Sequence, residues 1–385
     1  MKKLFFYVSI VLLAGCKERY DAPVQSPVTG YLVMEGSVNS DAGSSTITLS
    51  RTAGLRNTTP LYESGAIVKL EADDNSTYSF SEKGQGQYSI NNPALGNNKK
   101  YRLRIQTKAG KQYLSDFATV NSNPPVDSIS WKKENGNGVQ LYVNTHDPLN
   151  NTRYYQWSFD EAWEIHMPYI SVLKYKITRI GPREFYSVVY KDSTTFSYDP
   201  TIITCWQFYS SQNLLLGSTA KLSSDVVYLP IEFIPHASIK LGVLYSINVK
   251  QYSWTKQGYE FLDRMKKNTE ATGSVFDPQP SELKGNLHCI TDPTEPVIGY
   301  FNICPFREKR IFIKSTDVLP WDYSSGCYEI EVENISDSIE AKASGLTPTT
   351  IGKSFNGTIL TFFAALPTCV DCTINGSNKK PSYWP

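Results

Sequence analysis

Residues that carry most enzymatic chemistry are scarce in this sequence, which has four histidines and four methionines among 385 residues. The histidines form no His-x-x-x-His pair and no Glu-x-x-His helix, so a metalloprotease site is not supported. They are His146, His166, His236 and His288. No Gly-x-Ser-x-Gly elbow is present, and Gly84 and Gly86 lack the third glycine of a dinucleotide-binding loop. We therefore expect no enzymatic activity, no metal site and no cofactor.

An excess of charge of either sign is also lacking. Lys and Arg total 38 against 37 Asp and Glu, and no stretch is rich in Lys and Arg, so nucleic acid is not expected as a partner. Asp160, Glu161 and Glu164 are close enough in sequence to suggest the paired carboxylates of a glycosidase. Acidic residues this close usually lie on a solvated edge, and we interpret them in that way.

Aromatic and β-branched residues are abundant. The 25 Tyr, 17 Phe and 7 Trp stand against only 4 Met, and runs of Val, Ile, Thr and Tyr recur, which favours strands over helical bundles. A length of 385 residues, at roughly 100 to 200 residues per domain, suggests two or three domains. We expect a mainly β, multidomain protein.

No apolar run is long enough to cross a bilayer as a helix. Lys2 and Lys3 precede the apolar residues 4–14, a layout typical of a secretory signal and shorter than the roughly 17 to 25 residues of a spanning helix. Leu13, Ala14 and Gly15 then lead into Cys16, which resembles the lipobox of bacterial lipoproteins. The sequence predicts a signal peptide over 1–15 and lipidation of Cys16. The alternative is an ordinary cleaved signal with a cysteine nearby.

A short polar stem follows the predicted lipidation site. Residues 16–29 contain two prolines and little that is apolar, as expected for a flexible tether between a membrane lipid and a fold. Lys17, Glu18 and Asp21 loosely resemble the signal that sends Bacteroidota lipoproteins to the outer face of the outer membrane. We expect an outer-membrane, lipid-anchored protein exposed at the cell surface, although the same residues also fit a simple solvated tether.

The first domain is expected to be an immunoglobulin-like β-sandwich over residues 30–122. Strands are predicted at 31–38, 45–52, 66–71, 77–82 and 101–107. Within them Ile47 and Leu49 alternate with polar residues, as do Leu103 and Ile105, so each strand should have one buried face. The spacing of these strands is typical of a sandwich that ends before Asn123.

The rest of the chain, residues 127–385, is expected to form a larger β-rich domain with one amphipathic helix. Strand patterns appear at 128–132, 139–144, 154–159, 169–177, 185–190, 226–233, 241–253, 297–303 and 309–313. The period changes after residue 253. Thr255 can cap a helix near 256–268, with Trp254 and Tyr259 as a hydrophobic staple and Phe261 and Leu262 facing inward.

Six cysteines remain after Cys16 is set aside, and in an exported protein an even number suggests disulfides. The candidates are Cys205, Cys289, Cys304, Cys327, Cys369 and Cys372. Six cysteines allow fifteen pairings, so the sequence does not choose among them. Cys369 and Cys372 form a Cys-x-x-Cys, which we interpret as a structural disulfide or as two bridges to other parts of the chain, since no redox or zinc context accompanies it.

The densest aromatic cluster lies just before the middle of the chain. Tyr154, Tyr155, Trp157 and Trp163 are candidates for stacking on a sugar or peptide ligand. Aromatic residues that alternate along a strand are more often part of the core, and we favour that interpretation.

The last third of the chain carries runs that resemble a known family. They are 274–280 (Ser-Val-Phe-Asp-Pro-Gln-Pro), 284–286 (Lys-Gly-Asn), 297–301 (Val-Ile-Gly-Tyr-Phe), 369–372 (Cys-Val-Asp-Cys) and 380–384 (Lys-Pro-Ser-Tyr-Trp). Leu32, Leu49, Arg51 and Val68 agree in the first domain. The sequence resembles the Bacteroidota lipoproteins catalogued as domain of unknown function 4249. Cys289 and Cys304 depart from that pattern, and we interpret them as a candidate local disulfide.

The resemblance implies an outer-membrane lipoprotein of β-sandwich type, commonly encoded beside TonB-dependent transporters and without an established enzymatic role. We therefore expect a non-catalytic accessory or ligand-binding partner of such a transporter, held to the membrane by its lipid. The alternative is a free-standing surface adhesin or structural lipoprotein. Asn286 follows Gly285 as in a turn, and it is also a candidate ligand contact.

Overall fold

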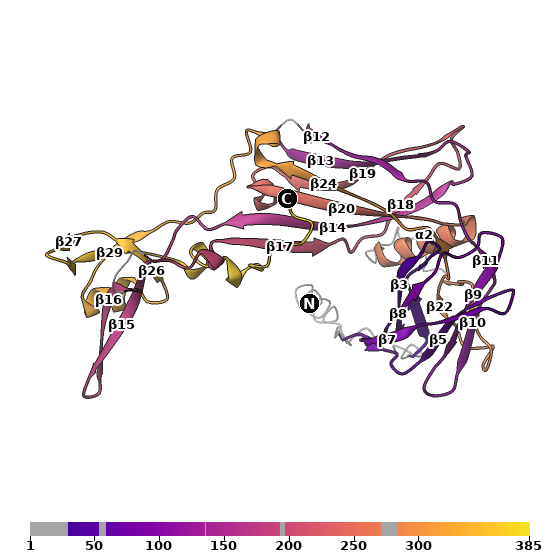
Figure 1. The fold of residues 1–385 in the computed structure, drawn as a ribbon, viewed down its shortest axis with the longest axis horizontal. Coiled ribbons are helices and arrows are strands. Elements are labelled where there is room, and N and C mark those ends of the chain that lie inside the picture. Colours follow the sequence, from indigo (N-terminus) through magenta and orange to yellow (C-terminus); the bar gives the residue numbers. More distant parts are fainter. Residues whose placement is uncertain (1–29, 54–58, 135, 193–196, 271–282) are drawn as a thin grey trace, which may run out of the picture.

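The computed structural model describes residues 30–53, 59–134, 136–192, 197–270 and 283–385. The predicted signal peptide, Cys16, the stem and the family run at 274–280 lie outside these residues. The fold is mainly β, as predicted (Figure 1). Among the described residues, no helix combines the length and the apolar character needed to cross a membrane.

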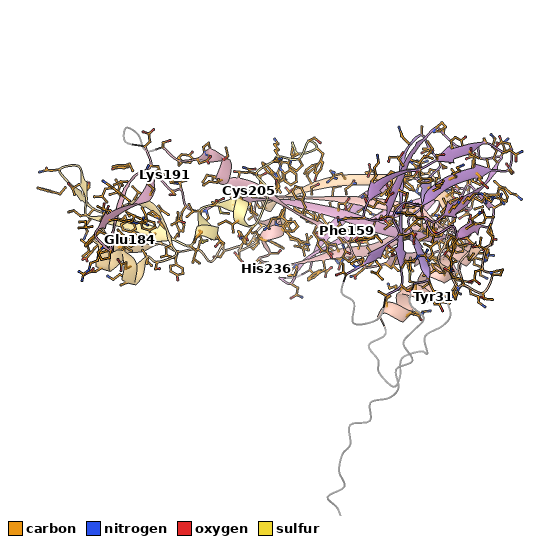
Figure 2. The ribbon with its side chains drawn as sticks, turned by 90° about the horizontal axis from the view of Figure 1, so that it is seen from below. Tyr31, Phe159, Glu184, Lys191, Cys205 and His236 are labelled. Atoms are coloured by element: carbon orange, nitrogen blue, oxygen red, sulfur yellow. A yellow bond between two sulfur atoms is a disulfide. The ribbon has the colours of Figure 1, made fainter. Side chains whose placement is uncertain are left out.

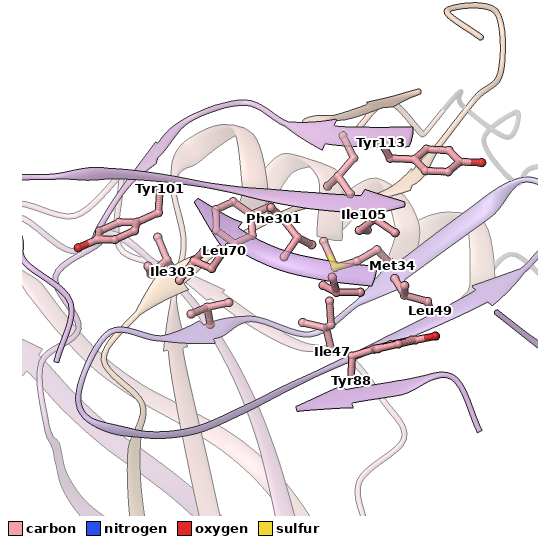
Figure 3. Packing of buried hydrophobic residues seen from close by; sticks show 14 of the residues in the cluster. Met34, Ile47, Leu49, Leu70, Tyr88, Tyr101, Ile105, Tyr113, Phe301 and Ile303 are labelled. Carbon is pink, nitrogen blue, oxygen red and sulfur yellow. The ribbon is translucent and has the colours of Figure 1, made fainter. Parts of the chain in front are cut away.

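An N-terminal sandwich is built from two sheets. One has the order β22 (Ile298–Gly299), β1 (Leu32–Glu35), β3 (Gly43–Arg51), β8 (Gln87–Asn92) and β7 (Ser81–Gly84), with β4 (Leu61–Tyr62) beside β3. The other has the order β21 (Leu287–Cys289), β10 (Gln112–Ser115), β9 (Lys100–Gln106), β5 (Ile67–Ala72) and β6 (Thr77–Ser79), with β11 (Ala118–Thr119) beside β9. The predicted alternation is confirmed, because Ile47, Leu49, Leu103 and Ile105 are all buried between the sheets (Figure 3).

Part of this sandwich comes from a distant stretch of sequence, which we call the return segment (residues 284–304). Its strand β21 pairs with β10, β22 runs parallel to β1, and β23 (Ile303–Cys304) runs parallel to β2 (Val38–Asn39). Phe301 and Ile303 of this segment are buried in the sandwich core (Figure 3). The sequence had placed these residues in the second domain, but their strands complete the first.

Two further sheets form the middle of the molecule. The three-stranded sheet has the order β12 (Val126–Glu134), β13 (Gly138–Asp147) and β19 (Asp225–Pro235). The five-stranded sheet has the order β17 (Thr204–Ser210), β14 (Tyr154–His166), β20 (Leu244–Ser253) and β24 (Arg307–Lys314), with β18 (Leu215–Ser218) beside β14. Side chains such as Leu141, Val143 and Ile247 fill a shared core. We call these two sheets the central sheets.

The predicted helix is confirmed as α2 (Lys256–Glu270). Thr255 caps it, since its Oγ1 accepts a hydrogen bond from the Gly258 N–H at 3.1 Å. Phe261 and Leu262 are buried, and they share a hydrophobic cluster with Trp254 and Tyr259. The described part of the chain also has a second helix, α3 (Ser336–Lys342), which the sequence did not predict. With 7 residues, α3 is too short to reveal a helical period in the sequence.

A smaller unit lies at the end of the molecule opposite the sandwich (Figure 1), and we call it the distal lobe (residues 172–190 and 330–365). It contains α3, the hairpin of β15 (Leu173–Ile180) and β16 (Arg183–Tyr190), the sheet β25 (Ile330–Glu333), β29 (Thr361–Ala365) and β26 (Thr347–Ile351), and the hairpin of β27 (Ser354–Phe355) and β28 (Thr358–Ile359). It has its own core, in which Val188, Ile339 and Phe362 are buried.

Two disulfides lie between the distal lobe and the central sheets, in a region that we call the neck. Cys205 bonds to Cys372 and Cys327 bonds to Cys369, next to the short helices η4 (Pro367–Cys369) and η5 (Cys372–Ile374). Figure 2 places Cys205 between Glu184 of the distal lobe and Phe159 of the central sheets. The Cys-x-x-Cys therefore makes two bridges to other parts of the chain, one of the two alternatives that the sequence allowed.

Cys289 and Cys304 are both free and buried, so the local disulfide proposed for them is wrong. Each lies on a strand of the return segment, but β21 pairs with β10 while β23 pairs with β2. Cys289 packs in the sandwich core as a small apolar group, and Cys304 is completely buried beside Asn302.

Candidate functional site

The predicted aromatic cluster does not form one site. A strand rises about 3.3 Å per residue, so Tyr154 and Trp163 are roughly 30 Å apart along β14. Tyr155 and Trp157 are completely buried and stack with ring centroids 5.4 Å apart. The Tyr155 hydroxyl donates to Asp225, and Trp157 Nε1 donates to Gln251 Oε1 at 2.9 Å. No ligand can reach these two rings, so the core interpretation is right for them and the ligand interpretation is wrong.

The other two aromatic residues of the cluster are half-buried. Trp163 donates from Nε1 to Gln207 Oε1 at 2.7 Å, and its ring lies 5.5 Å from Lys240 Nζ. Tyr154 packs against Tyr259 of α2, with ring centroids 5.1 Å apart. Tyr154 therefore belongs to the cluster around α2, whereas Trp163 lies on a different part of the central sheets.

The alternation of β14 places Glu161 on one face of the strand and Asp160 and Glu164 on the other. Asp160 pairs with Lys250 at 2.6 Å and Glu164 accepts from Trp384 Nε1 at 2.8 Å. Glu161 is buried and accepts hydrogen bonds from Lys240 and Tyr245, so the interpretation as a solvated edge is wrong for this residue.

Charges compensate one another around Glu161. Burial opposes protonation of Lys240, but its hydrogen bonds to Glu161 and the charges of Glu161 and Glu232 outweigh this effect, so the pKa of Lys240 is raised. Burial, together with the charge of Glu161, raises the pKa of Glu232. This cluster is an internal ion-pair network.

Asn286 serves the fold and not a ligand. Its side chain is buried, with Nδ2 donating to the Phe301 carbonyl at 3.0 Å and Oδ1 accepting from the Phe301 N–H at 2.7 Å. The amide thus pairs with both polar groups of one backbone residue inside the return segment. The ligand-contact interpretation of Asn286 is wrong.

Two glycines of the return segment, Gly285 and Gly299, allow close approach between backbones. A Cβ on Gly285 would lie 1.6 Å from the Gly299 carbonyl oxygen, and a Cβ on Gly299 would lie 2.6 Å from the Met34 carbonyl oxygen. Only glycine permits such close backbone approach. The motif therefore fastens the return segment to itself and to β1.

The return segment also forms one wall of a cavity between the sandwich and the central sheets, which we call the interdomain cleft. Its volume is about 720 Å³, within the range typical of small-molecule sites. The cleft is lined by β1 and β3 from the sandwich, β14, β20 and β24 from the central sheets, and α2. These elements meet beside α2 (Figure 1).

One side of the cleft is apolar and aromatic. The Tyr300 ring packs on Trp254 at 6.0 Å and on Phe261 at 5.9 Å, and Met265 and Ile298 complete this surface. Trp254 is buried, and its Nε1 has no hydrogen-bond partner within the described ranges. A buried N–H without a partner is uncommon.

The other side of the cleft carries charged residues, and three of them, Lys250, Arg307 and Glu308, have polar partners. Lys250 binds Asp160, and the hydrogen bond and charge of Asp160 outweigh burial and raise the pKa of Lys250. Arg307 pairs with Asp41 at 2.6 Å, and Glu308 accepts from Asn248 at 2.8 Å. Such a site suits binding of an apolar or aromatic group with a polar edge. In the described part of the chain, no group of three or more His, Cys, Asp or Glu side chains could hold a metal ion.

Sequence reasoning did not identify the cleft, although it singled out several of its residues. Trp254 and Phe261 were assigned to packing of the helix, and Ile298 and Tyr300 were noted only as part of the family motif. No local pattern indicates that residues near 35, 250, 261 and 300 share one cavity.

Two solved structures are similar to this chain at low sequence identity. No curated protein matches it. Among solved structures, a chitinase ChiA74 from Bacillus thuringiensis is 11% identical over 53% of this chain and 29% of that chain, with a TM-score of 0.15. A biofilm-associated protein BSP domain is 9% identical over 88% of this chain and 76% of that chain, with a TM-score of 0.17. This chain thus spans under a third of the chitinase.

A family model does match most of the chain. It covers residues 17–310, from the predicted stem through the sandwich, the central sheets and the return segment. The matched region includes the glycines and Asn286 that fasten the return segment to the sandwich. The chain belongs to the family described as domain of unknown function DUF4249.

Proposed function

We propose that the protein is a non-catalytic outer-membrane lipoprotein of Bacteroidota type that serves a TonB-dependent transporter as an accessory or ligand-binding partner. Lipidation at Cys16 and display on the cell surface are part of this proposal. The lipobox-like Leu13, Ala14, Gly15 and Cys16 support the anchor, and the similarity to lipoproteins encoded beside such transporters supports the partner.

The observation that carries the ligand-binding role is the interdomain cleft. Its apolar wall of Trp254, Tyr300 and Phe261 favours a small ligand with an aromatic or apolar part. Two cations of its lining are held in ion pairs, Lys250 with Asp160 and Arg307 with Asp41.

The partner is tested by detergent co-purification of the tagged lipoprotein from its native membranes. We expect a TonB-dependent barrel to accompany it. A protein that purifies alone while the barrel is intact and expressed would favour the alternative of a free-standing adhesin or structural lipoprotein.

The anchor and the orientation need separate measurements. Cys16→Ser should release the protein from membranes or stall its processing, because one thiol carries the lipid. Protease treatment of intact cells should cleave a surface-exposed protein, and full protection would place it on the periplasmic face. Phe261→Ala should leave membrane attachment unchanged while weakening ligand binding in the cleft.

A further inference from the structure

The hairpin formed by β15 and β16 projects from the distal lobe. Its two-residue turn, Gly181 and Pro182, has Gly181 at φ +63°, which fits a turn that begins with glycine in the left-handed region. In Figure 1 the hairpin and the N-terminal sandwich extend from the central sheets toward the same side of the molecule, at its two ends.

The two faces of this hairpin differ in what they contact. Residues paired across antiparallel strands share a face. The face that carries Leu173, Tyr175 and Val188 packs into the distal core. The opposite face, which we call the outer face, consists of Lys174, Lys176, Thr178, Ile180, Arg183, Phe185, Ser187 and Val189.

The outer face combines apolar and basic side chains and has no carboxylate. Ile180 is 66% exposed and Phe185 is 41% exposed. Lys174, Lys176 and Arg183 are exposed as well. The described residues provide no ion pair for Lys176 or Arg183. In a chain with 38 basic and 37 acidic residues, this is a local concentration of positive charge.

The tip of the hairpin is exposed on both sides. Ile177, on the face opposite Ile180, is 51% exposed, and the nearby Arg179 pairs with Glu184 at 2.7 Å. A two-stranded ribbon with apolar residues on both sides of its tip fits between lipid headgroups better than on a flat protein surface, which would cover only one side.

We propose that the β15–β16 hairpin contacts an anionic membrane surface, with Ile177, Ile180 and Phe185 entering the headgroup region and the cations of the outer face meeting lipid phosphates. Basic residues near an anionic leaflet and partly inserted apolar side chains each add to membrane affinity. The affinity of the hairpin for lipid is independent of the anchor, but its position at a membrane in the cell rests on the proposed lipidation.

The test uses the mature chain from residue 17 onward, so that neither a lipid nor the apolar residues 4–14 attach it to the vesicles. Co-flotation is measured with vesicles of phosphatidylcholine alone and of phosphatidylcholine mixed with phosphatidylglycerol. We expect binding only to the anionic vesicles, and K176E/R183E should weaken it at least about tenfold because both cations become anions. Ile180→Ser with Phe185→Ser should also weaken it without any change in charge.

A matched control makes the same charge change elsewhere. Lys132 and Lys221 are exposed lysines of the central region, so K132E/K221E should keep nearly all of the binding. Circular dichroism should be identical for all variants, because the substituted side chains are exposed. Equal binding by K176E/R183E and the parent, or no preference for anionic vesicles, would overturn the proposal.

A protein partner is a distinct outcome. The parent protein could bind neither kind of vesicle while K176E/R183E abolishes co-purification of a barrel from native membranes. In that case the hairpin is a protein-docking element and the membrane proposal is wrong. Failure on vesicles leaves the accessory role untested and standing, since that role depends on the transporter and not on lipid affinity.

Discussion

The sandwich and the distal lobe are attached to the central sheets by different physical means. At the sandwich, the return segment adds strands to the N-terminal sheets, and Gly285 and Asn286 fix its path without any covalent cross-link. At the distal lobe, Cys205–Cys372 and Cys327–Cys369 join the segments of the neck.

A buried polar hub adds to the attachment of the sandwich. Gln251 is completely buried, and its Nε2 donates to the Asn123 side chain and the Pro124 carbonyl. Asn123 Nδ2 in turn donates to the carbonyls of Gln251 and Pro305. The linker at Asn123 and Pro124, which the sequence predicted as a domain boundary, is thus hydrogen-bonded to β20. The interdomain cleft therefore lies where backbone pairing and buried amides join the sandwich to the central sheets. The attachment of the distal lobe, by contrast, is stabilised by the two disulfides of the neck.

The largest expected effect comes from opening the neck. Removing a native disulfide typically costs about 2 to 5 kcal/mol, because it frees a loop in the unfolded chain. The loops here span 42 and 167 residues. We expect C205A/C372A and C327A/C369A to expose the distal lobe to limited proteolysis while a fragment containing the sandwich persists, as read by mass spectrometry. Equal cleavage of sandwich and lobe would show that the two regions do not differ in this way.

A substitution that displaces the return segment should destabilise the sandwich, at the end of the molecule opposite the distal lobe. Gly285→Ala would place Cβ 1.6 Å from the Gly299 carbonyl oxygen. Because the backbone around Gly299 must move to make room, we expect the free energy of unfolding to fall by about 3 kcal/mol. Denaturant unfolding measures it. Gly96→Ala is the matched control, because its closest neighbour is the Asn98 side chain, which can turn away. A similar loss in both variants would count against the close-approach explanation.

A smaller effect is expected at the amide hub. Gln251→Leu leaves Trp157 Nε1 and the Pro124 carbonyl without their partner, at about 1 to 3 kcal/mol for a buried group. We expect a lower thermal midpoint and weaker binding in the cleft. Gln212→Leu should be nearly neutral, because this side chain is exposed and donates one hydrogen bond, to the Ser210 carbonyl, among the described residues. An unchanged thermal midpoint in Gln251→Leu would show that the polar hub does not stabilise the attachment of the sandwich.

The smallest expected effect concerns the cysteines, which are free thiols in the return segment and disulfides in the neck. Burial raises the pKa of Cys304 to about 11, so its thiol stays protonated and unreactive near pH 8. The native mature protein should take up no iodoacetamide there, and the denatured, unreduced protein should label Cys289 and Cys304 only. Stability from the neutral Cys304 thiol is present below its ordinary pKa of 9.0 and is lost as the pH rises through about 11. Labelling of four further cysteines without reductant would contradict the neck disulfides.

Local patterns were sufficient for much of the fold. Alternation predicted which side chains of β3 and β9 are buried, and Thr255 with Trp254 predicted where α2 begins. Such features depend on residues a few positions apart, whose geometry the helix or strand itself imposes. The sequence also favoured the core interpretation of Tyr155 and Trp157, and their complete burial agrees with it.

Partners distant in sequence were decided only by the tertiary structure. The residue pattern predicts a strand at 297–303 but not that β22 runs beside β1, some 265 residues earlier. Six cysteines allow fifteen pairings, and only the position of the neck selects two bridges and leaves Cys289 and Cys304 reduced. The interdomain cleft has the same origin, because its walls come from β1, β20, α2 and the return segment, which meet only when the sandwich closes against the central sheets.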